Sequence, residues 1–206
     1  MLKIWGRMTS INVQKVAWCV DELGIPYERI DAGREFGHND TPEYLAKNPN
    51  GLIPLIEDDG FALWESNAIV RYLAAKHGLG TICPADPQQR ASADRWMDWQ
   101  ATTLNIPIGA CFVQLIRTPA AERDMKVVNT NRPIAEKRLA MLDAVLARSE
   151  FLNGDAFTMA DIPAGLSVRR WQALPLERQT HPNVNRWLAT LAALAGAQQS
   201  FAVPVV

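Results

Sequence analysis

The sequence contains few of the residues that build metal sites and disulfide frameworks. Three cysteines and three histidines occur among its 206 residues. The cysteines, Cys19, Cys83 and Cys111, are far apart and form no CxxC pair. Scattered cysteines in odd number are typical of proteins in a reducing compartment, and so few histidines argue against a histidine-based metal site. We therefore expect neither disulfides nor a bound metal.

An excess of charge and a long apolar run are missing as well. The 21 Lys and Arg residues nearly balance the 22 Asp and Glu residues, so there is no overall field to attract nucleic acid or an anionic membrane. No apolar run approaches the length of a membrane span, and the one at Leu2–Trp5 is too short for a signal peptide. The composition, 48% hydrophobic and 21% charged, is that of a globular protein, for which we expect a cytoplasmic location.

The first 78 residues alternate between strand and helix patterns. Strand patterns occur at residues 2–5, 27–31, 54–57 and 61–64. Helix patterns occur at residues 13–23, 42–45 and 66–77. Glycines follow the first and last of these helices, as is usual at helix ends. The order β-α-β-α-β-β-α predicts a mixed sheet with helices packed on it.

The second part of the chain has helix patterns alone. Residues 79–86 are rich in Gly and Pro and predict a linker. We expect helices to begin at Pro87, at Pro133 and near Pro182, and Pro107 to kink the first of them. The fold class predicted is therefore α+β: a first domain at 1–78, the linker at 79–86, and an all-helical second domain at 87–206.

A capping box is predicted in the second domain. Thr158 stands three residues before Asp161, with Phe157 and Ile162 at the spacing of a hydrophobic staple. We expect Thr158 and Asp161 to start a buried helix and to take no part in chemistry.

Two polar corners of the first domain could together hold a small zwitterionic peptide. In Asn48-Pro49-Asn50-Gly51-Leu52-Ile53-Pro54, Asn50 offers an amide and the residue before Pro54 can expose its backbone. In Glu65-Ser66-Asn67-Ala68-Ile69, Ser66 can cap a helix whose first N–H groups face an anion. Each corner could equally be a well-made turn.

Four motifs resemble those of one enzyme family. The motif Asn48-Pro49-x-Gly51-x-Ile53-Pro54 resembles the turn before the cis-proline of glutathione transferases, and residues 65–69 resemble their glutathione-binding corner. Residues 157–162 resemble the capping box of their second domain, and residues 182–187 resemble their final helix. Because the four stand in the family's order over nearly the whole chain, the sequence is similar to a glutathione transferase. The resemblance implies a thioredoxin-like first domain and an all-α second domain.

The resemblance also implies a catalytic residue just after the first strand. Ser10 fills that position, as in the theta- and delta-like classes, and would donate a hydrogen bond to the glutathione sulfur. Asn12 is the alternative donor. From the residues alone, Ser10 is better explained as a plain helix N-cap. Lys15, one turn further on, is expected to be a solvated surface lysine.

By resemblance, glutathione binds along the two corners. A cis peptide at Ile53-Pro54 would present the Ile53 backbone to the cysteinyl residue, where the residues alone would favour a trans proline. Ser66 would bind the γ-glutamyl carboxylate and Glu65 its ammonium group. Asn50 and His38 are candidates for the remaining contacts, His38 for the glycyl carboxylate.

The function expected is that of a cytoplasmic, homodimeric glutathione transferase, a detoxification enzyme. Glutathione would be its co-substrate, and the chain would need no metal, nucleic acid or membrane. The second domain would hold a small hydrophobic electrophile, near Ile106, Cys111, Leu115 and residues 201–206. Two alternatives stay open: a glutathione-dependent disulfide reductase or peroxidase, and a non-catalytic dimeric binding module.

Overall fold

The computed structural model describes residues 1–206, which form two compact units. The first unit comprises Met1–Cys83 with Leu194–Pro204, and the second comprises Pro84–Ala193 with Val205–Val206. The chain passes from one unit to the other inside the predicted linker. None of the helices combines the length and the apolar run that crossing a bilayer requires.

The first unit is built on a four-stranded mixed sheet. Its strands are β1 (Leu2–Trp5), β2 (Tyr27–Ile30), β3 (Leu55–Asp58) and β4 (Phe61–Trp64). Their order across the sheet is β2-β1-β3-β4, with β1 and β2 parallel and the two other pairs antiparallel. The predicted strand order and the α+β class are confirmed.

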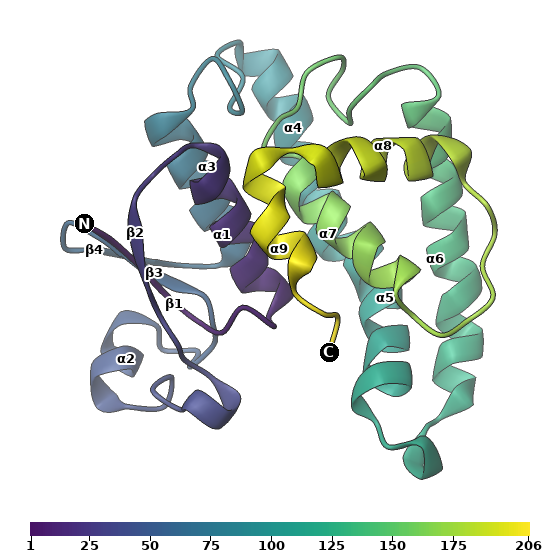
Figure 1. Ribbon diagram of the computed structural model, residues 1–206, viewed down its shortest axis with the longest axis horizontal. Helices are drawn as coiled ribbons and strands as arrows, with labels where there is room; N and C mark the ends of the chain where they lie inside the picture. The colour runs from purple at the N-terminus through teal and green to yellow at the C-terminus, as the bar shows by residue number, and fades with distance from the viewer. The chain divides into compact units, whose positions relative to one another are not determined.

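Helices lie on both sides of this sheet. Helices α1 (Ile11–Glu22) and α3 (Ser66–His77) pack against each other, while α2 (Pro42–Lys47) lies on the other side of the strands (Figure 1). The ring of Trp5 in β1 meets that of Tyr44 in α2 edge to face, with ring centres 6.0 Å apart. The apolar faces of both layers are thus covered, as a stable sheet requires.

The loop between β2 and α2 contains one turn of 3₁₀ helix, η1 (Arg34–Phe36). Gly33 precedes it and Gly37 follows it, and the Gly33 N–H donates to the Gly37 carbonyl at 2.7 Å. Arg34 and His38 have φ values of 53° and 67°. Side chains other than glycine seldom adopt this left-handed region, so the loop holds an uncommon shape.

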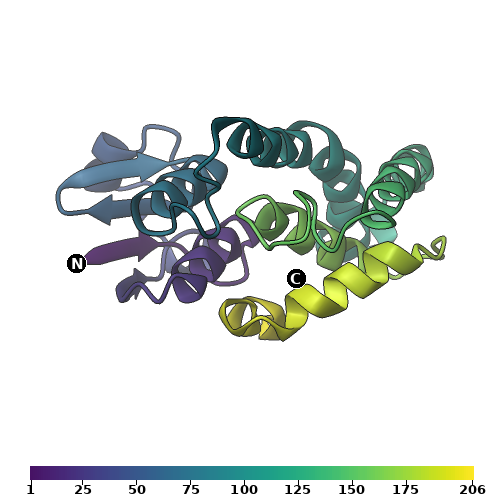
Figure 2. The same ribbon diagram turned by 90° about the horizontal axis from the view of Figure 1, so that it is seen from above.

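The second unit is helical, as predicted. Its elements are α4 (Pro87–Trp99), the π-helical turn η2 (Gln100–Leu104), α5 (Asn105–Phe112), the π-helical turn η3 (Val113–Arg117), the 3₁₀ turn η4 (Ala120–Glu122), α6 (Met125–Leu146), α7 (Asp161–Gln172) and α8 (Pro182–Ala193). Helix α6 packs against α5 and α8, and α7 packs against α4, α5 and α8 (Figure 2).

Two prolines behave differently from the sequence prediction. Pro133 lies inside α6, which begins eight residues earlier, where the Asp124 carboxylate accepts the N–H of Lys126 at 2.9 Å. Proline removes one helical hydrogen bond, but the rest of this long helix packs well enough to continue through it. Around Pro107 the chain stays helical, with π-helical turns on either side of α5 in place of a simple kink.

The C-terminal segment also departs from the prediction. The turn η5 (Ala195–Ala197) and the helix α9 (Gln198–Ala202) pack on α1 in the first unit, so residues 194–204 do not belong to the second. The ring of Phe201 meets Trp18 edge to face at 5.5 Å. This large apolar contact was invisible in the sequence because the two residues are so far apart in the chain.

Helix α7 begins at a buried carboxylate. Asp161 is fully buried and accepts the N–H of Thr158 at 2.9 Å and its hydroxyl at 3.3 Å. Its other oxygen accepts the N–H of Leu152 and the indole N–H of Trp187, both at 3.0 Å. Burial raises the pKa of Asp161 to about 6 against the effect of these donors. The predicted bond from Thr158 back to Asp161 is present, but the Thr158 hydroxyl accepts the N–H of Ala160 at 3.4 Å and not that of Asp161, so half of the capping box forms as predicted.

Candidate functional site

The turn before β3 is held by one buried amide. Asn48 is 1% exposed, and its amide donates to the Leu52 carbonyl at 2.7 Å, to which Tyr44 also donates at 2.6 Å. The Asn48 side-chain oxygen accepts the backbone N–H and the side-chain amide of Asn50, at 3.1 and 3.2 Å. Asn48 thus fixes the turn that presents Asn50 and Ile53, a role that Asx-turns commonly serve.

The backbone of Ile53 is left without partners. The Ile53-Pro54 peptide is cis, as predicted. The Leu52 carbonyl accepts two hydrogen bonds and the β-ladder begins at Leu55, yet no hydrogen bond of the structure uses the N–H or C=O of Ile53. A donor and an acceptor side by side can pair with an extended peptide as an added strand would.

Helix α3 begins without a side-chain cap. Glu65, not Ser66, occupies the N-cap position, with φ 72°, and its carboxylate makes no capping bond. The expectation that Ser66 caps the helix is therefore wrong: Ser66 is the first helical residue, because the sharp bend falls one residue earlier. The first N–H groups of α3 remain available to an anion.

Lys15 of α1 forms hydrogen bonds with the first turn of α3. It is 4% exposed, and its ammonium group donates to the Asn67 side chain at 3.1 Å and to the Ser66 hydroxyl at 3.5 Å. The expectation of a solvated lysine is wrong, because the packing of α1 against α3 covers this position. A positive charge beneath the first turn favours an anion there.

Helix α1 also begins without a side-chain cap. Ser10 has the extended backbone of an N-cap residue, and its carbonyl accepts the N–H of Gln14 at 2.9 Å, but its hydroxyl makes no capping bond. Asn12, in the first turn, is exposed. The plain N-cap explanation of Ser10 therefore lacks the hydrogen bond that defines it.

A small hollow of about 60 Å³ gathers most of the predicted binding residues. It is bordered by Asn12, Asn48, Asn50, Leu52, Ile53, Pro54, Trp64, Glu65 and Ser66. Ser10 is not among the bordering residues and lies two positions before Asn12 at the start of α1. The structure thus joins the two polar corners and the beginning of α1 in one place.

The structure does not bring His38 to this hollow. Its ring meets Trp5 edge to face at 6.3 Å and borders a different hollow, of about 370 Å³, with Tyr44 and Lys47. Its neighbour Asn39 donates to the Gly51 carbonyl at 2.6 Å and so ties the loop to the turn. Sequence spacing could not tell on which side of the strands this loop directs its side chains.

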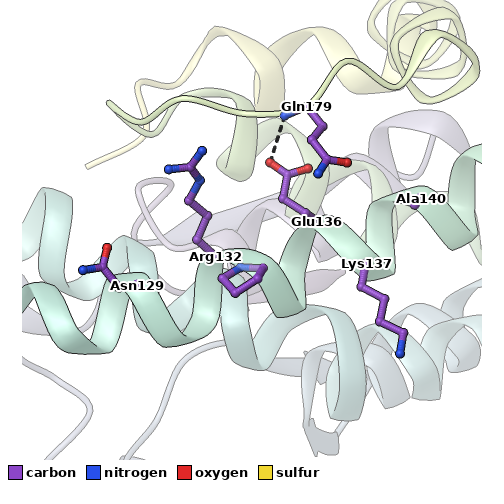
Figure 3. A pocket seen from close by; sticks show the side chains of 7 residues that line it. Asn129, Arg132, Glu136, Lys137, Ala140 and Gln179 are labelled. Carbon is purple, nitrogen blue, oxygen red and sulfur yellow. Dashed lines mark hydrogen bonds between the residues drawn. The ribbon is translucent and has the colours of Figure 1, made fainter.

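Another hollow lies on α6 of the second unit and has a volume of about 440 Å³. Figure 3 shows Glu136 pointing to the segment that contains Gln179, and Lys137 pointing away from it. The Glu136 carboxylate accepts the Gln179 N–H at 3.1 Å and contacts His181 Nε2 at 3.0 Å. Its polar groups hold that segment in place, so the hollow is explained by the packing of α6.

The cysteines are placed as core residues. Cys19 and Cys111 are both fully buried, and burial raises the pKa of each thiol. Leu115 is 6% exposed and Ile106 is 62% exposed. Cys111 and Leu115 therefore cannot line an open electrophile pocket as the sequence suggested, whereas Ile106 is accessible.

Comparisons with known proteins decide the family. Residues 1–75 match the family model for the N-terminal domain of glutathione S-transferases, and residues 104–195 match the model for their C-terminal domain. The chain belongs to the glutathione S-transferase family. The resemblance predicted from the four motifs is confirmed.

Relatives match over the full length. The chain is 40% identical to glutathione S-transferase GstB of Escherichia coli K12 and covers 100% of both chains. It is 31% identical to glutathione S-transferase 4 of Zea mays, over 96% of this chain and 91% of the relative. It is similar in structure to the theta-class glutathione S-transferase of Xanthomonas axonopodis pv. citri with glutathione bound: TM-score 0.95, 41% identity, and coverage of 100% and 99%. The chain is thus a glutathione transferase family enzyme throughout its length.

Proposed function

We propose that the protein activates the thiol of glutathione for attack on a small hydrophobic electrophile. The observation that carries the proposal is the unpaired backbone of Ile53 beside the uncapped start of α3. The cysteinyl residue pairs with the Ile53 N–H and C=O. Ser66 and the first N–H groups of α3 bind the γ-glutamyl carboxylate, and Glu65 binds its ammonium group.

The thiolate is stabilised at the start of α1. A free thiol has a pKa of about 8.5, and lowering it by about two units requires about 2.7 kcal/mol in favour of the anion. A hydroxyl or amide donated to a charged sulfur contributes roughly 1.5–3 kcal/mol, and a helix N-terminus roughly 0.3–1 kcal/mol. Ser10 with the α1 N-terminus therefore suffices, and Asn12, which borders the hollow, is the second donor.

The glycyl residue of glutathione binds at the turn that contains Asn50, a residue that borders the hollow. His38 is kept as a candidate for the glycyl carboxylate, and His38→Ala tests it: glutathione affinity falls if the ring reaches the ligand and stays constant if its contact with Trp5 is its whole role.

The second domain, residues 87–193, supplies the electrophile site and the contacts of a homodimer in the cytoplasm. Ile106, exposed on α5, is the side chain offered for either role. Light scattering of the purified protein measures the dimer directly, and a mass of one chain would remove that part of the proposal.

The test of the function uses calorimetry for glutathione binding and two substrates for turnover. An aryl halide reports conjugation, and hydroxyethyl disulfide reports disulfide reduction. We expect the wild type and the Ser10→Ala and Asn12→Ala variants all to bind glutathione, with conjugation slowed most in Ser10→Ala. Absence of glutathione binding refutes the proposal. Disulfide turnover without conjugation assigns the protein to the reductase alternative.

A further inference from the structure

Arg7 is the arginine that stands out in the interior. Its side chain is 9% exposed, and no other arginine is buried to this degree. No hydrogen bond or ion pair involves its guanidinium group, and Nε is buried without any partner. Buried polar groups are nearly always paired, so a buried arginine Nε without a partner calls for an explanation.

Two other arginines of the chain use their donors, whereas Nε of Arg138 is, like that of Arg7, buried without a partner. Arg90 donates to the carbonyls of Pro84 and Ala85, and Arg186 donates to those of Leu146 and Ser149. The fold thus pairs guanidinium groups with carbonyls even at partly exposed positions. Arg7 is more deeply buried than these two arginines, yet its guanidinium group makes no such hydrogen bond.

The surroundings of Arg7 are shaped to hold the guanidinium. A Cβ atom at Gly33 would lie 2.9 Å from Nη1 of Arg7 and 3.1 Å from Cδ1 of Ile53, so a side chain there would displace both. Gly33 also has φ +84°, which disfavours other residues. The guanidinium and the side chain of Ile53 therefore lie against the same glycine, and Ile53 is the residue whose backbone we propose to bind the peptide.

The charged groups that face Arg7 do not neutralise it. Burial lowers the pKa of Arg7, Arg34 of the turn η1 lowers it further, and Glu35 raises it. Glu35 is exposed and forms no ion pair with Arg7. The positive charge of Arg7 thus has no protein counter-ion in contact with it.

Arg7 and Ser10, the proposed donor to the sulfur, belong to the same backbone turn. The N–H of Ser10 donates to the carbonyl of Arg7 at 3.1 Å, and the N–H of Arg7 donates to the carbonyl of Ala32 at 3.2 Å. The Gln14 amide holds the middle of the turn through the Met8 carbonyl at 2.8 Å. Arg7 and Ser10 therefore keep a fixed separation.

We propose that the Arg7 guanidinium is a positive charge reserved for the glutathione thiolate held at Ser10. This inference rests on the proposed function. It makes Arg7 a positioning residue that acts through its field on the sulfur, while Ser10 makes the direct contact. An opposite charge nearby lowers the pKa of an acid, and we expect about one unit for the thiol at this site.

The experiment compares Arg7→Met, which keeps length and loses charge, with Arg7→Lys, which keeps charge. Arg34→Met is the matched control, since Arg34 carries the same charge on the exposed surface of the neighbouring loop. The thiolate absorbance of bound glutathione is titrated against pH, the glutathione affinity is measured, and the thermal midpoint is measured without glutathione.

We expect Arg7→Met to raise the pKa of bound glutathione by about one unit, equal to about tenfold less thiolate at pH well below it. Arg7→Lys retains most of the thiolate, and Arg34→Met shifts the pKa by less than about 0.3 units because water screens its charge. The thermal midpoint of Arg7→Met without ligand stays constant or rises, because no hydrogen bond or ion pair is lost and a buried unpaired Nε is removed.

Two results would overturn the inference. One is an unchanged thiol pKa in Arg7→Met. The other is a lower thermal midpoint in Arg7→Met with an unchanged pKa, which would assign Arg7 to the support of the fold. If the wild type fails to bind glutathione at all, the proposed function falls and this inference with it. Normal wild-type binding with an unaffected variant removes this inference alone.

Discussion

Helix α7 and the helices α1 and α3 begin in opposite ways. At α7, Asp161 is fully buried and accepts four hydrogen bonds from three residues. At α1 and α3, the N-cap residues Ser10 and Glu65 make no capping bond with their side chains. A polar side chain at the start of the helix is thus fully hydrogen-bonded at α7, where it is the first helical residue, and makes no capping bond at α1 and α3, where it is the N-cap residue.

Four other helices of the chain have side-chain acceptors for their first N–H groups. The helices α2, α4, α6 and α8 begin at backbone N–H groups accepted by Thr41, Asp86, Asp124 and Asp143, respectively. Helices α1 and α3 have no side-chain cap, and a residue in the first turn of each, Asn12 and Ser66, borders the small hollow. A missing cap typically costs about 1 kcal/mol, so the starts of α1 and α3 give up stability at the place where we propose that glutathione binds.

The largest effect is expected at the start of α7. Replacing Asp161 by alanine should lower the free energy of unfolding by about 3–5 kcal/mol, because four buried donors lose their acceptor at once. Urea unfolding measures it, with Thr158→Ala as a control that loses about 1 kcal/mol. A loss below about 1 kcal/mol for Asp161→Ala would mean that the contrast between the helix starts is unimportant for stability.

The pH dependence of stability sharpens the comparison further. Burial raises the folded pKa of Asp161 to about 6, against about 3.9 in the unfolded chain. The folded state therefore binds the Asp161 proton more tightly than the unfolded state does. The contribution of Asp161 to the free energy of unfolding is thus most favourable below about pH 4, and it falls by about 2–3 kcal/mol as the pH rises to about 6. Urea midpoints between pH 4 and 7 should show this fall in the wild type relative to Asp161→Asn. Parallel profiles would contradict it.

At the uncapped start of α3, the expected effect is on binding. Replacing Glu65 by glutamine removes the charge offered to the γ-glutamyl ammonium and should weaken glutathione binding by about 1.5–3 kcal/mol, roughly ten- to a hundredfold. Stability should not fall, because the carboxylate makes no capping bond. Calorimetry with Glu28→Gln, an exposed carboxylate on β2, provides the control. Equal affinities in the two variants would exclude Glu65 from the site.

Much of this contrast could be predicted from the sequence where the signal is local. The bond between Thr158 and Asp161 and the strand Leu2–Trp5 depend on neighbouring residues, and both are found as predicted. The cis peptide before Pro54 followed from the resemblance, since spacing alone favours trans.

What the sequence could not reveal depends on contacts between distant segments. The burial of Lys15 requires α3 to pack on α1, and the place of residues 194–204 requires Phe201 to reach Trp18. Pro133 marked a helix start by local rules, but α6 packs strongly enough to continue through it. The unpartnered guanidinium of Arg7 has no sequence signature at all, because an absence of partners exists only in three dimensions.

The most direct test of the whole account measures one variant, Ser10→Ala, in two ways. Urea unfolding reports whether the hydroxyl caps α1, and the thiolate absorbance of bound glutathione against pH reports whether it holds the sulfur. We predict a free energy of unfolding within about 0.5 kcal/mol of the wild type and a glutathione pKa raised by about one to two units. A loss of about 1 kcal/mol in stability with an unchanged thiolate titration would show that Ser10 is a helix cap and contradict the account.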